Sequence, residues 1–447
     1  MKEQSGNWHI APGFGVWTMS RRQMLIAAAC AAGCALASRS IAFGSEVWKL
    51  SKDDEAFLDD LERQGCMYFW EQASPKTGQV LDRARNDLGG ARDTRRMASI
   101  ASTGFGLTAL CIADRHGYLP HAQVVERVKT TLEWHLNSMP EVHGFFYHFT
   151  DIETGERFRD VELSSIDTSL LLCGVLTARA YFDDPHIQLQ AQQIYERVDW
   201  PWMLNDGEAF SMGWKPETGF LDSRWSRYCE LMMIYLLAIG SPTHSVAPSC
   251  WNNFTRPVIH YKGYDYISGN DPLFTHQYSQ AWYDFRGKRD AYADYFVNSI
   301  TATRAHKAFC LSYPEWYSDD YWGITASDSA RGYTAWGGPP AQGQIDGTVV
   351  PAAAAGSLAF VPGDCLSVLR AMRLKWGKQA WGRYGFVDAF HPAANWYDPD
   401  VLGIDQGISV VMAENLRSEL VWNTFMRNRE CVKAMQLVGF HGKGLSG

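Results

Sequence analysis

The chain lacks the short motifs that serve serine, zinc and nucleotide chemistry. It contains no GxSxG, no HExxH, no P-loop and no Rossmann glycine pattern after a strand. Its 10 cysteines are scattered singly without a CxxC pair, and its 13 histidines show no ligand spacing. These absences disfavour serine hydrolases, zinc enzymes and nucleotide-dependent enzymes, and we expect neither a cofactor nor a bound metal ion.

An excess of positive charge is absent as well. Lys and Arg total 41 against 49 Asp and Glu, which gives a formal net charge of −8. Nucleic-acid binders carry a basic patch or stripe, and the sequence shows none. We therefore expect no nucleic-acid partner.

Long apolar runs are missing, so we expect no stable membrane span. The apolar run Met24–Ala37 is shorter than the roughly 20 residues that a spanning helix needs. It follows Arg21 and Arg22, and a twin arginine before a short apolar run of small residues is typical of a twin-arginine export signal. We expect residues 1–42 to be this signal, 43–447 to form one domain, and the mature protein to be periplasmic or secreted.

Two alternatives to a cleaved signal remain. The stretch Ala31-Ala32-Gly33-Cys34 is a poor lipoprotein box that would tether the protein through Cys34, and an uncleaved N-terminal anchor is the other option. Because the twin-arginine route carries folded proteins, we expect stability not to depend on disulfides formed after export.

Helical patterns dominate what the chain does contain. Apolar residues recur at spacings of three and four in many segments, and a capping-box pattern at Ser164 and Asp167 opens one of them. The candidate helices cover 52–73, 97–116, 121–138, 164–182, 186–198, 223–239, 281–306, 363–376 and 407–429. No linker, charge block or fixed-period repeat interrupts them, which predicts one all-α domain whose long loops gather at one end.

The segment from Tyr313 to Pro362 is unusually rich in Trp, Tyr, Gly, Pro and Asp. Its flat rings belong to Trp316, Tyr317, Tyr321, Trp322, Tyr333 and Trp336, and its charged groups to Glu315, Asp319, Asp320, Asp328, Arg331 and Asp346. Rings stack on the apolar face of a sugar, and carboxylates bind hydroxyls or transfer protons. The segment therefore indicates a carbohydrate cleft, with a long loop that packs its own aromatics as the alternative.

Glu230 is the first candidate for acid–base chemistry. It lies at the edge of the almost wholly apolar segment Cys229–Leu237, and burial raises the pKa of a carboxyl to the range a general acid needs. The alternatives are an ion pair with Arg224 or Arg227, or an exposed position.

Further acids open or precede predicted helices. Glu162 could bind sugar hydroxyls, whereas Asp167 could equally be a helix cap. Asp405 lies just before a predicted helix, where its carboxylate could be a helix cap or a general base. Glu414 is polar in an apolar helix, so it either faces the cleft or joins a buried network.

At these residues the chain resembles the bacterial glycoamylase-like domain family, which includes endo-β-1,2-glucanases and a domain of cyclic β-1,2-glucan synthases. The resemblance covers roughly residues 55–430 and is more specific for the family than for a substrate. It rests on Trp322–Asp328, Gly332-Tyr333, Trp336-Gly337, Asp346-Gly347-Thr348, Pro351–Ser357, Phe360-Val361-Pro362, Ser164–Thr168, Glu230 with Ile239–Thr243, Ile404–Gly407 and Glu414-Asn415.

The resemblance implies an (α/α)6 toroid whose loops form a cleft at one end, with residues 43–447 as its catalytic domain. It implies glycosidic-bond cleavage by two carboxylates, with Glu230 as general acid and Asp405 as a less secure general base. The implied substrate-binding residues are Glu162, Asp167, Tyr228, Trp316, Trp322, Asp328, Arg331, Trp336, Asp346 and Glu414.

The expected activity is hydrolysis of a glucan, and the family resemblance favours a β-1,2-linked one. We expect inversion at the anomeric carbon and a monomeric protein. Four alternatives stay open at this point. They are transglycosylation in the same fold, α-glucan cleavage of the glucoamylase type, a polysaccharide lyase acting on uronates, and a periplasmic glycan-binding protein without turnover.

Overall fold

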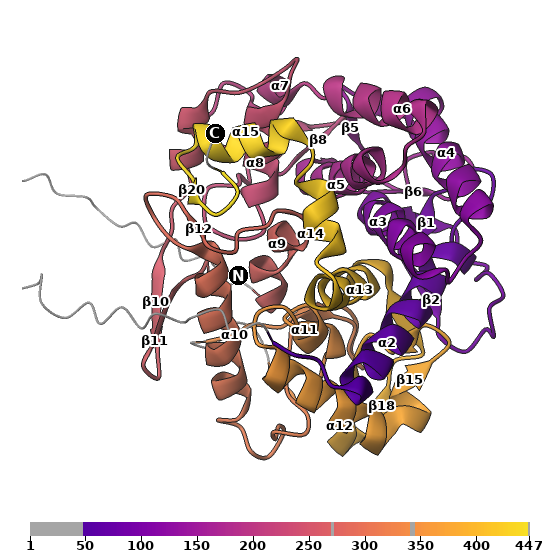
Figure 1. Ribbon diagram of the computed structural model, residues 1–447, viewed down its shortest axis with the longest axis vertical. Coiled ribbons are helices and arrows are strands. Elements are labelled where there is room, and N and C mark those ends of the chain that lie inside the picture. Colours follow the sequence, from indigo (N-terminus) through magenta and orange to yellow (C-terminus); the bar gives the residue numbers. More distant parts are fainter. Residues whose placement is uncertain (1–47, 270–271, 340–344, 446–447) are drawn as a thin grey trace, which may run out of the picture. The chain divides into compact units, whose positions relative to one another are not determined.

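The computed structural model describes residues 48–269, 272–339 and 345–445 (Figure 1). Helices predominate, as the sequence predicted, and the residues of the expected export signal lie outside the described ranges. The helices are α2 (Lys52–Glu71), α3 (Ile100–His116), α4 (His121–Asn137), α5 (Ser165–Tyr181), α6 (Pro185–Glu196), α7 (Trp200–Leu204), α8 (Met232–Gly240), α9 (Tyr278–Trp282), α10 (Tyr295–Cys310), α11 (Pro351–Ala355), α12 (Pro362–Ala380), α13 (Gly403–Arg417), α14 (Leu420–Phe425) and α15 (Arg429–Leu437), with 3-10 turns at Pro248–Asn252, Leu273–His276 and Pro392–Ala394.

The strands are short and pair in sheets of two or three strands; several form hairpins, whereas β2 pairs with β19 and β12 with β20 across long sequence separations. Those around the site described below are β1 (Val80–Leu81), β2 (Arg83–Arg85), β3 (Met97–Ser99), β6 (Phe149–Asp151), β7 (Leu163–Ser164), β8 (Gly213–Lys215), β13 (Ala326–Ser327), β14 (Thr334–Ala335), β16 (Gly385–Phe386), β17 (Phe390–His391) and β19 (Asp400–Leu402). The others are β4 (Glu141–Val142), β5 (Phe145–Phe146), β9 (Gly219–Phe220), β10 (Val258–Tyr261), β11 (Tyr264–Ile267), β12 (Lys288–Arg289), β15 (Trp381–Gly382), β18 (Trp396–Tyr397) and β20 (His441–Gly442).

Three helices, α3, α5 and α13, are buried along most of their length and pack against one another or against α2 (Figure 1). Helices α4 and α6 lie outside them with one apolar face turned inward. Burial of whole helices requires sequences that are apolar all round, which is what Leu170–Leu176 provides. The core therefore consists of enclosed helices covered by amphipathic ones.

Helices α3 and α5 touch through their backbones because glycine stands at the contact on both. A Cβ atom at Gly174 would lie 2.0 Å from the carbonyl oxygen of Gly104, and one at Gly104 would lie 2.3 Å from that of Leu170. No side chain fits such a gap. This close approach fixes the position of the two helix N-termini relative to each other.

The sequence prediction was wrong for the first half of 223–239. Residues 223–231 form an irregular segment, and α8 begins only at Met232. The backbone there bonds to a distant strand-like segment, since Tyr228 N donates to Thr255 O and Thr255 N donates to Ser226 O. These tertiary hydrogen bonds override a local helical pattern.

The predicted helix 281–306 is likewise interrupted, because α9 ends at Trp282 and α10 begins at Tyr295. Helix 407–429 is divided into α13 and α14 with Glu419 in the left-handed region between them. The cysteines of the described residues are buried and form no disulfide. Within the described ranges no helix has the length and apolar character needed to cross a bilayer.

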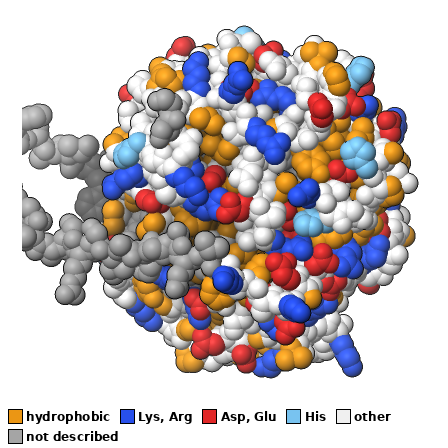
Figure 2. Space-filling view, in the orientation of Figure 1, with side chains coloured by type: hydrophobic (Ala, Val, Ile, Leu, Met, Phe, Trp, Pro, Cys, Tyr) orange, Lys and Arg blue, Asp and Glu red, His pale blue; other side chains and the backbone are white. Residues whose placement is uncertain are grey.

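Positive and negative side chains are interspersed on the face of the molecule seen in Figure 2. This matches the absence of a basic stripe in the sequence.

Candidate active site

The N-termini of the three buried helices face one cavity. Each helix follows a short strand that is paired with a neighbouring segment: β3 leads into α3, β7 into α5 and β19 into α13. The cavity has a volume of about 340 Å³. It is lined by Asp82, Arg83, Met97, Ser99, His148, Phe149, Asp167, Tyr333, Leu402 and Ile404.

One wall of the cavity carries His148 between two carboxylates. Its Nδ1 lies 3.0 Å from Glu162 Oε1, and its Nε2 lies 3.6 Å from Asp167 Oδ2. Burial alone would lower the pKa of His148, but the neighbouring Asp167 and Glu162 carboxylates outweigh it and raise the pKa to about 9. The imidazole is therefore a cation at neutral pH, and its hydrogen bond in turn lowers the pKa of Glu162.

The N-cap residue of α5 is Ser164, and Asp167 lies three residues after it and lines the cavity. Ser164 Oγ accepts a hydrogen bond from Asp167 N and donates one to Asp167 Oδ2 at 2.5 Å. The carboxylate is thus fixed in direction by the start of α5.

A second wall carries Arg83 between acids. Its Nε donates to Asp82 Oδ2 at 3.0 Å, and its Nη1 pairs with Asp328 Oδ2. Burial raises the pKa of Asp82, and the guanidinium only partly offsets this. Asp328, which the sequence singled out, is therefore at the site and is held by a cation from a distant segment.

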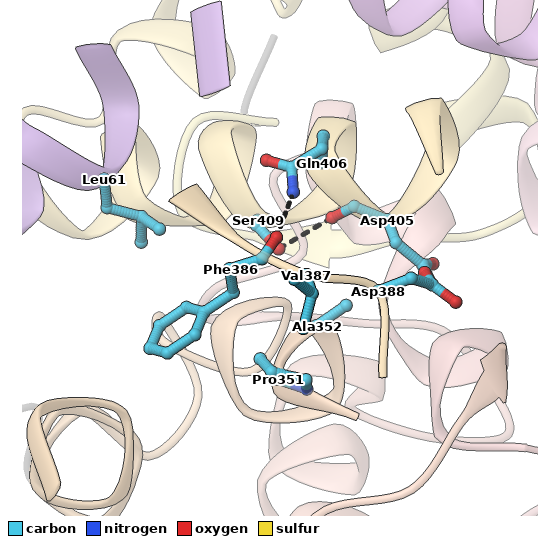
Figure 3. A pocket seen from close by; sticks show the side chains of 9 residues that line it. All are labelled: Leu61, Pro351, Ala352, Phe386, Val387, Asp388, Asp405, Gln406 and Ser409. Carbon is cyan, nitrogen blue, oxygen red and sulfur yellow. Dashed lines mark hydrogen bonds between the residues drawn. The ribbon is translucent and has the colours of Figure 1, made fainter. Parts of the chain in front are cut away.

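Asp405 stands in the first turn of α13 and is 4 % exposed. Its carboxyl group points toward that of Asp388, which is 3 % exposed, and Figure 3 shows the two side by side. Burial raises the pKa of Asp405, and the nearby Asp328 and Asp82 carboxylates raise it further. A hydrogen bond from Asp388 acts in the opposite direction and favours the ionised form of Asp405.

Glu230 is 9 % exposed and lies in the turn just ahead of α8, not inside a helix. Its backbone oxygen accepts a hydrogen bond from Ser279 Oγ at 2.6 Å, which ties it to α9. The neighbouring Tyr278 is buried, and its hydroxyl pKa is raised first by burial and then by surrounding charges. Those charges belong to Asp405, Tyr333, Glu230 and Asp167. The charges of three sequence-predicted acids therefore act on one buried tyrosine.

Several predicted sugar-binding rings are placed elsewhere. Trp322 is fully buried, and Trp336 is 3 % exposed with its Nε1 donating to Ser327 Oγ at 3.0 Å. Tyr228 is fully buried and its ring stacks on Tyr295. Trp322 and Trp336 thus pack the core beneath the loops, which is the alternative interpretation of the segment from Tyr313 to Pro362. Tyr228 is also packed in the core, and none of the three rings offers an exposed face to a ligand.

Glu414 is also away from the cavity. It is fully buried nine residues after Asp405 on the same helix, about 13 Å along its axis. Its Oε2 lies 2.8 Å from His116 Nε2, and its Oε1 accepts from Ser418 Oγ. Of the two interpretations of this residue, the structure supports the buried network.

The remaining predicted binding residues, Asp346, Trp316 and Arg331, differ in burial and in their contacts. Asp346 Oδ1 accepts hydrogen bonds from Thr348 N and Oγ1 at 2.9 and 2.7 Å, so it shapes its own loop. Trp316 is half-buried and stacks on Tyr313, and Arg331 is exposed.

Arg83, His148, Asp388 and Asp398 also lie at the site, although the sequence did not single them out as site residues. Asp398 follows two aromatic residues in Trp396-Tyr397-Asp398, the same composition that drew attention to 313–362. His148 and Arg83 lie in ordinary strand-like contexts, and only tertiary contacts identify them.

Two groups of side chains within the described ranges are close enough to share a cation. In each, the three ligand atoms lie within 4.8 Å of one another, namely Glu62, His116 and Glu414 in one and Asp328, Asp388 and Asp398 in the other. Each group already contacts an arginine, Arg417 and Arg83 respectively. The charges are thus partly neutralised by the protein itself.

The chain is similar to proteins that are named as glucan-degrading enzymes. The Glycoamylase family model matches residues 222–429. The exo-β-1,2-glucooligosaccharide sophorohydrolase (non-reducing end) of Parabacteroides distasonis is 28% identical over 427 residues, covering 86% of this chain and 58% of that protein. The chain therefore spans a little over half the length of this curated relative.

Two solved structures are similar throughout. The endo-β-1,2-glucanase of Chitinophaga pinensis, in complex with sophorotriose and glucose, has a TM-score of 0.79 at 27% identity and covers 88% of this chain and 99% of that one. The β-1,2-glucanase of Parabacteroides distasonis has a TM-score of 0.79 at 26% identity and covers 88% of this chain and 60% of that one.

Proposed function

We propose that the chain is a member of the glycoamylase-like family and a glycoside hydrolase that cleaves β-1,2-linked glucan. The activity and linkage are those named for the similar proteins from Parabacteroides distasonis and Chitinophaga pinensis. The helix-rich fold and the enclosed α3, α5 and α13 support the toroid of alternating inner and outer helices that the family implies.

One observation of this chain carries the proposal. Asp167 lines the cavity of about 340 Å³, as does Ile404, the residue before Asp405. The charges of Glu230, Asp167 and Asp405, which come from three separate elements, all act on the buried Tyr278. Cleavage of a glycosidic bond needs two carboxyl groups in different protonation states on opposite sides of the bond.

In the proposed mechanism Glu230 is the general acid and protonates the leaving oxygen. The residue is 9 % exposed and comes from the turn ahead of α8. Asp405 is the general base and takes a proton from the attacking water, directly or through a sugar hydroxyl. The water attacks from the face opposite the leaving group, which inverts the anomeric carbon.

Substrate binding is assigned to the groups on the cavity wall. The His148 imidazolium and the Glu162 and Asp167 carboxylates offer donors and acceptors for hydroxyls. The ring of Tyr333 lines the cavity and is 53 % exposed, so it can stack on a sugar. Trp316 and Arg331 lie on the same loop segment and are proposed as contacts for more distant sugar units.

We also propose that the protein acts as a monomer and is exported through its twin-arginine signal.

The test is incubation of the purified protein with linear β-1,2-, β-1,3-, β-1,4-, α-1,4- and α-1,6-glucans, with products separated by chromatography. We expect oligosaccharides from the β-1,2-glucan alone. The sizes released at early times distinguish chain-end attack from internal attack, and excess acceptor sugar reveals any transglycosylation.

The matched variants are Glu230→Gln, which keeps the shape and removes the acid, and Glu208→Gln on an exposed loop as control. Hydrolysis of α-1,4-glucan instead would keep the reaction type and overturn the linkage. A lack of products from every glucan would overturn the hydrolase assignment.

A further inference from the structure

Asp388 is a buried acid of the site wall that the mechanism above does not use. It lies between β16 and β17, and its backbone N donates to Asp400 O at 3.0 Å, which joins it to the strand that leads into α13. Its Oδ2 accepts a hydrogen bond from Asp328 N at 2.7 Å. The carboxyl group is therefore fixed in direction by two separate loops.

The free oxygens of Asp388 and Asp405 are directed at each other. Among the described residues no donor group reaches Asp388 Oδ1 or Asp405 Oδ2, although both atoms are buried. The two side chains extend toward one another in Figure 3. A proton held between the two carboxyl groups satisfies both atoms, and nothing else in the described ranges does.

The space behind the pair is small and mostly apolar. A cavity of about 10 Å³ adjoins the two acids, and this volume is at the lower limit for one water molecule. Its other lining residues are Leu61, Pro351, Ala352, Phe386, Val387, Gln406 and Ser409. Solvent therefore cannot stabilise two negative charges there, and two adjacent carboxylates in such a place cannot both ionise.

The surroundings decide which acid keeps the proton. Burial raises the pKa of Asp405 to about 7, although the hydrogen bond from Asp388 and the charge of Arg83 favour its ionised form. Burial and the negative neighbours Asp405 and Asp398 raise the pKa of Asp388 well above the usual range. The titratable and charged groups that face the pair are Asp82, Arg83, Asp328, Asp398, Tyr278 and Tyr333.

We propose that Asp388 is a positioning residue that keeps its proton and donates a hydrogen bond to the Asp405 carboxylate, holding it charged and aimed into the site. This inference rests on the proposed function, in which Asp405 is the general base. Asp388 keeps its own proton throughout the cycle, and Asp405 takes the proton of the attacking water.

The first test compares Asp388→Leu, which removes the donor and keeps water out, with Asp388→Asn, whose amide can accept from Asp328 N and donate to Asp405. In the Leu variant the acid limb of the kcat/KM profile should move up by about one pH unit or more, with at least about a tenfold loss below it. The Asn variant should restore the wild-type limb, and Asp222→Asn, on an exposed loop, should change nothing.

An unshifted limb in the Leu variant would overturn the proposal. So would an Asn variant that fails in the same way as the Leu variant, because a purely structural role would not distinguish a donor from its absence.

A second measurement does not depend on activity. A group whose pKa is raised on folding contributes stability that is lost as pH rises from its unfolded value, about 3.9 for Asp, toward its folded value. The melting temperature of Asp388→Asn minus that of the wild type should therefore increase steadily between about pH 5 and pH 8. A constant difference would show Asp388 ionised in the folded protein and would overturn the proposal even if no glucan is cleaved.

A third measurement distinguishes a proton from a cation. A divalent ion at Asp328, Asp388 and Asp398 would hold Asp388 in its charged form. Loss of activity with a chelator and recovery with Ca²⁺ would overturn the proposal, whereas unchanged activity supports it. A wild type that is inactive on every glucan would refute the proposed function instead, leaving the melting experiment to decide the state of Asp388.

Discussion

Helix α13 has a buried carboxyl pair at each end, and the two pairs differ in what surrounds them. At its N-terminal end Asp405 meets Asp388 beside a small cavity, and the preceding Ile404 lines the cavity of about 340 Å³ together with Tyr333. At its C-terminal end Glu414 meets Glu62, both fully buried, with Arg417 against Glu62. In both pairs burial and the neighbouring acid raise the pKa of one carboxyl well above its usual range.

A buried acid with a raised pKa therefore does not by itself identify an active site. Glu62 and Glu414 contact His116, Arg417, Tyr118 and Ser418, although Glu62 Oε1 is buried without a hydrogen-bond partner among the described residues. Asp405 instead shares its surroundings with a cavity that a ligand can enter. Access, rather than burial, distinguishes the two ends.

The largest effect that tests this comparison is expected from Asp405→Asn. Removal of the general base should lower kcat on β-1,2-glucan by about 10²–10⁴-fold. The melting temperature should change little, since the Asn side chain can still bond to Asp388. Asp222→Asn is the control, and a variant within a few-fold of wild type would refute the role of Asp405.

A substitution at the C-terminal end of α13 should lower the stability of the protein and leave turnover nearly unchanged. Glu414→Ala leaves His116 and Ser418 without their carboxylate and creates a cavity, which should cost about 2–4 kcal/mol in the free energy of unfolding. At a temperature where the variant is folded, kcat/KM should stay within about threefold of wild type. Denaturant unfolding and initial rates check the two parts, and a large rate loss without a stability loss would remove the contrast between the ends.

A smaller effect is expected from His148, whose pKa is raised from 6.5 to about 9. Its contribution to stability is fully present below about pH 6.5 and is lost as pH rises through about 9. Because the side chain is 31% exposed, solvent screening should reduce this contribution to about 1–2 kcal/mol. The unfolding free energy of wild type should fall over this range, and that of His148→Gln should fall less. Parallel curves would show that the imidazole is not held as a cation.

The smallest effect is expected from Asp346→Ala. The variant loses two hydrogen bonds to Thr348 within one loop, which should cost about 1 kcal/mol. Activity should fall only modestly if the carboxylate shapes the loop without touching substrate. A loss of activity as large as that of Asp405→Asn would return Asp346 to the binding site, as the sequence first suggested.

The sequence was sufficient where local patterns govern structure. The apolar spacings predicted helices at 97–116 and 164–182, which correspond to α3 and α5, and the Ser164 side chain caps the second of them. It failed where hydrogen bonds between distant segments decide the backbone, as in 223–231, where Thr255 bonds to Ser226 and Tyr228. For the same reason Glu230 was assigned to a helix although it lies in a turn.

The site was predictable only in part because most of its contacts join residues far apart in the chain. The sequence placed Asp405 just ahead of a helix and Glu414 inside it, and it left a structural and a functional role open for each; only their tertiary neighbours separate them. Asp388 in Val387-Asp388-Ala389 gives no local signal, since its importance comes from Asp328 and Asp405. The aromatic content of the segment overestimated the number of sugar-stacking rings, because composition does not distinguish a buried tryptophan from an exposed one.

The glycine contact between α3 and α5 has a consequence for how such a protein can diversify. Gly104 and Gly174 tolerate no side chain, so the helices that set the spacing of the cavity wall are closed to gradual change. Tyr333, by contrast, stands on an exposed loop that meets the same cavity. Substitutions in this loop can therefore change which glucan is bound while the acids stay unaltered. A variant library of residues 329–335 would test this.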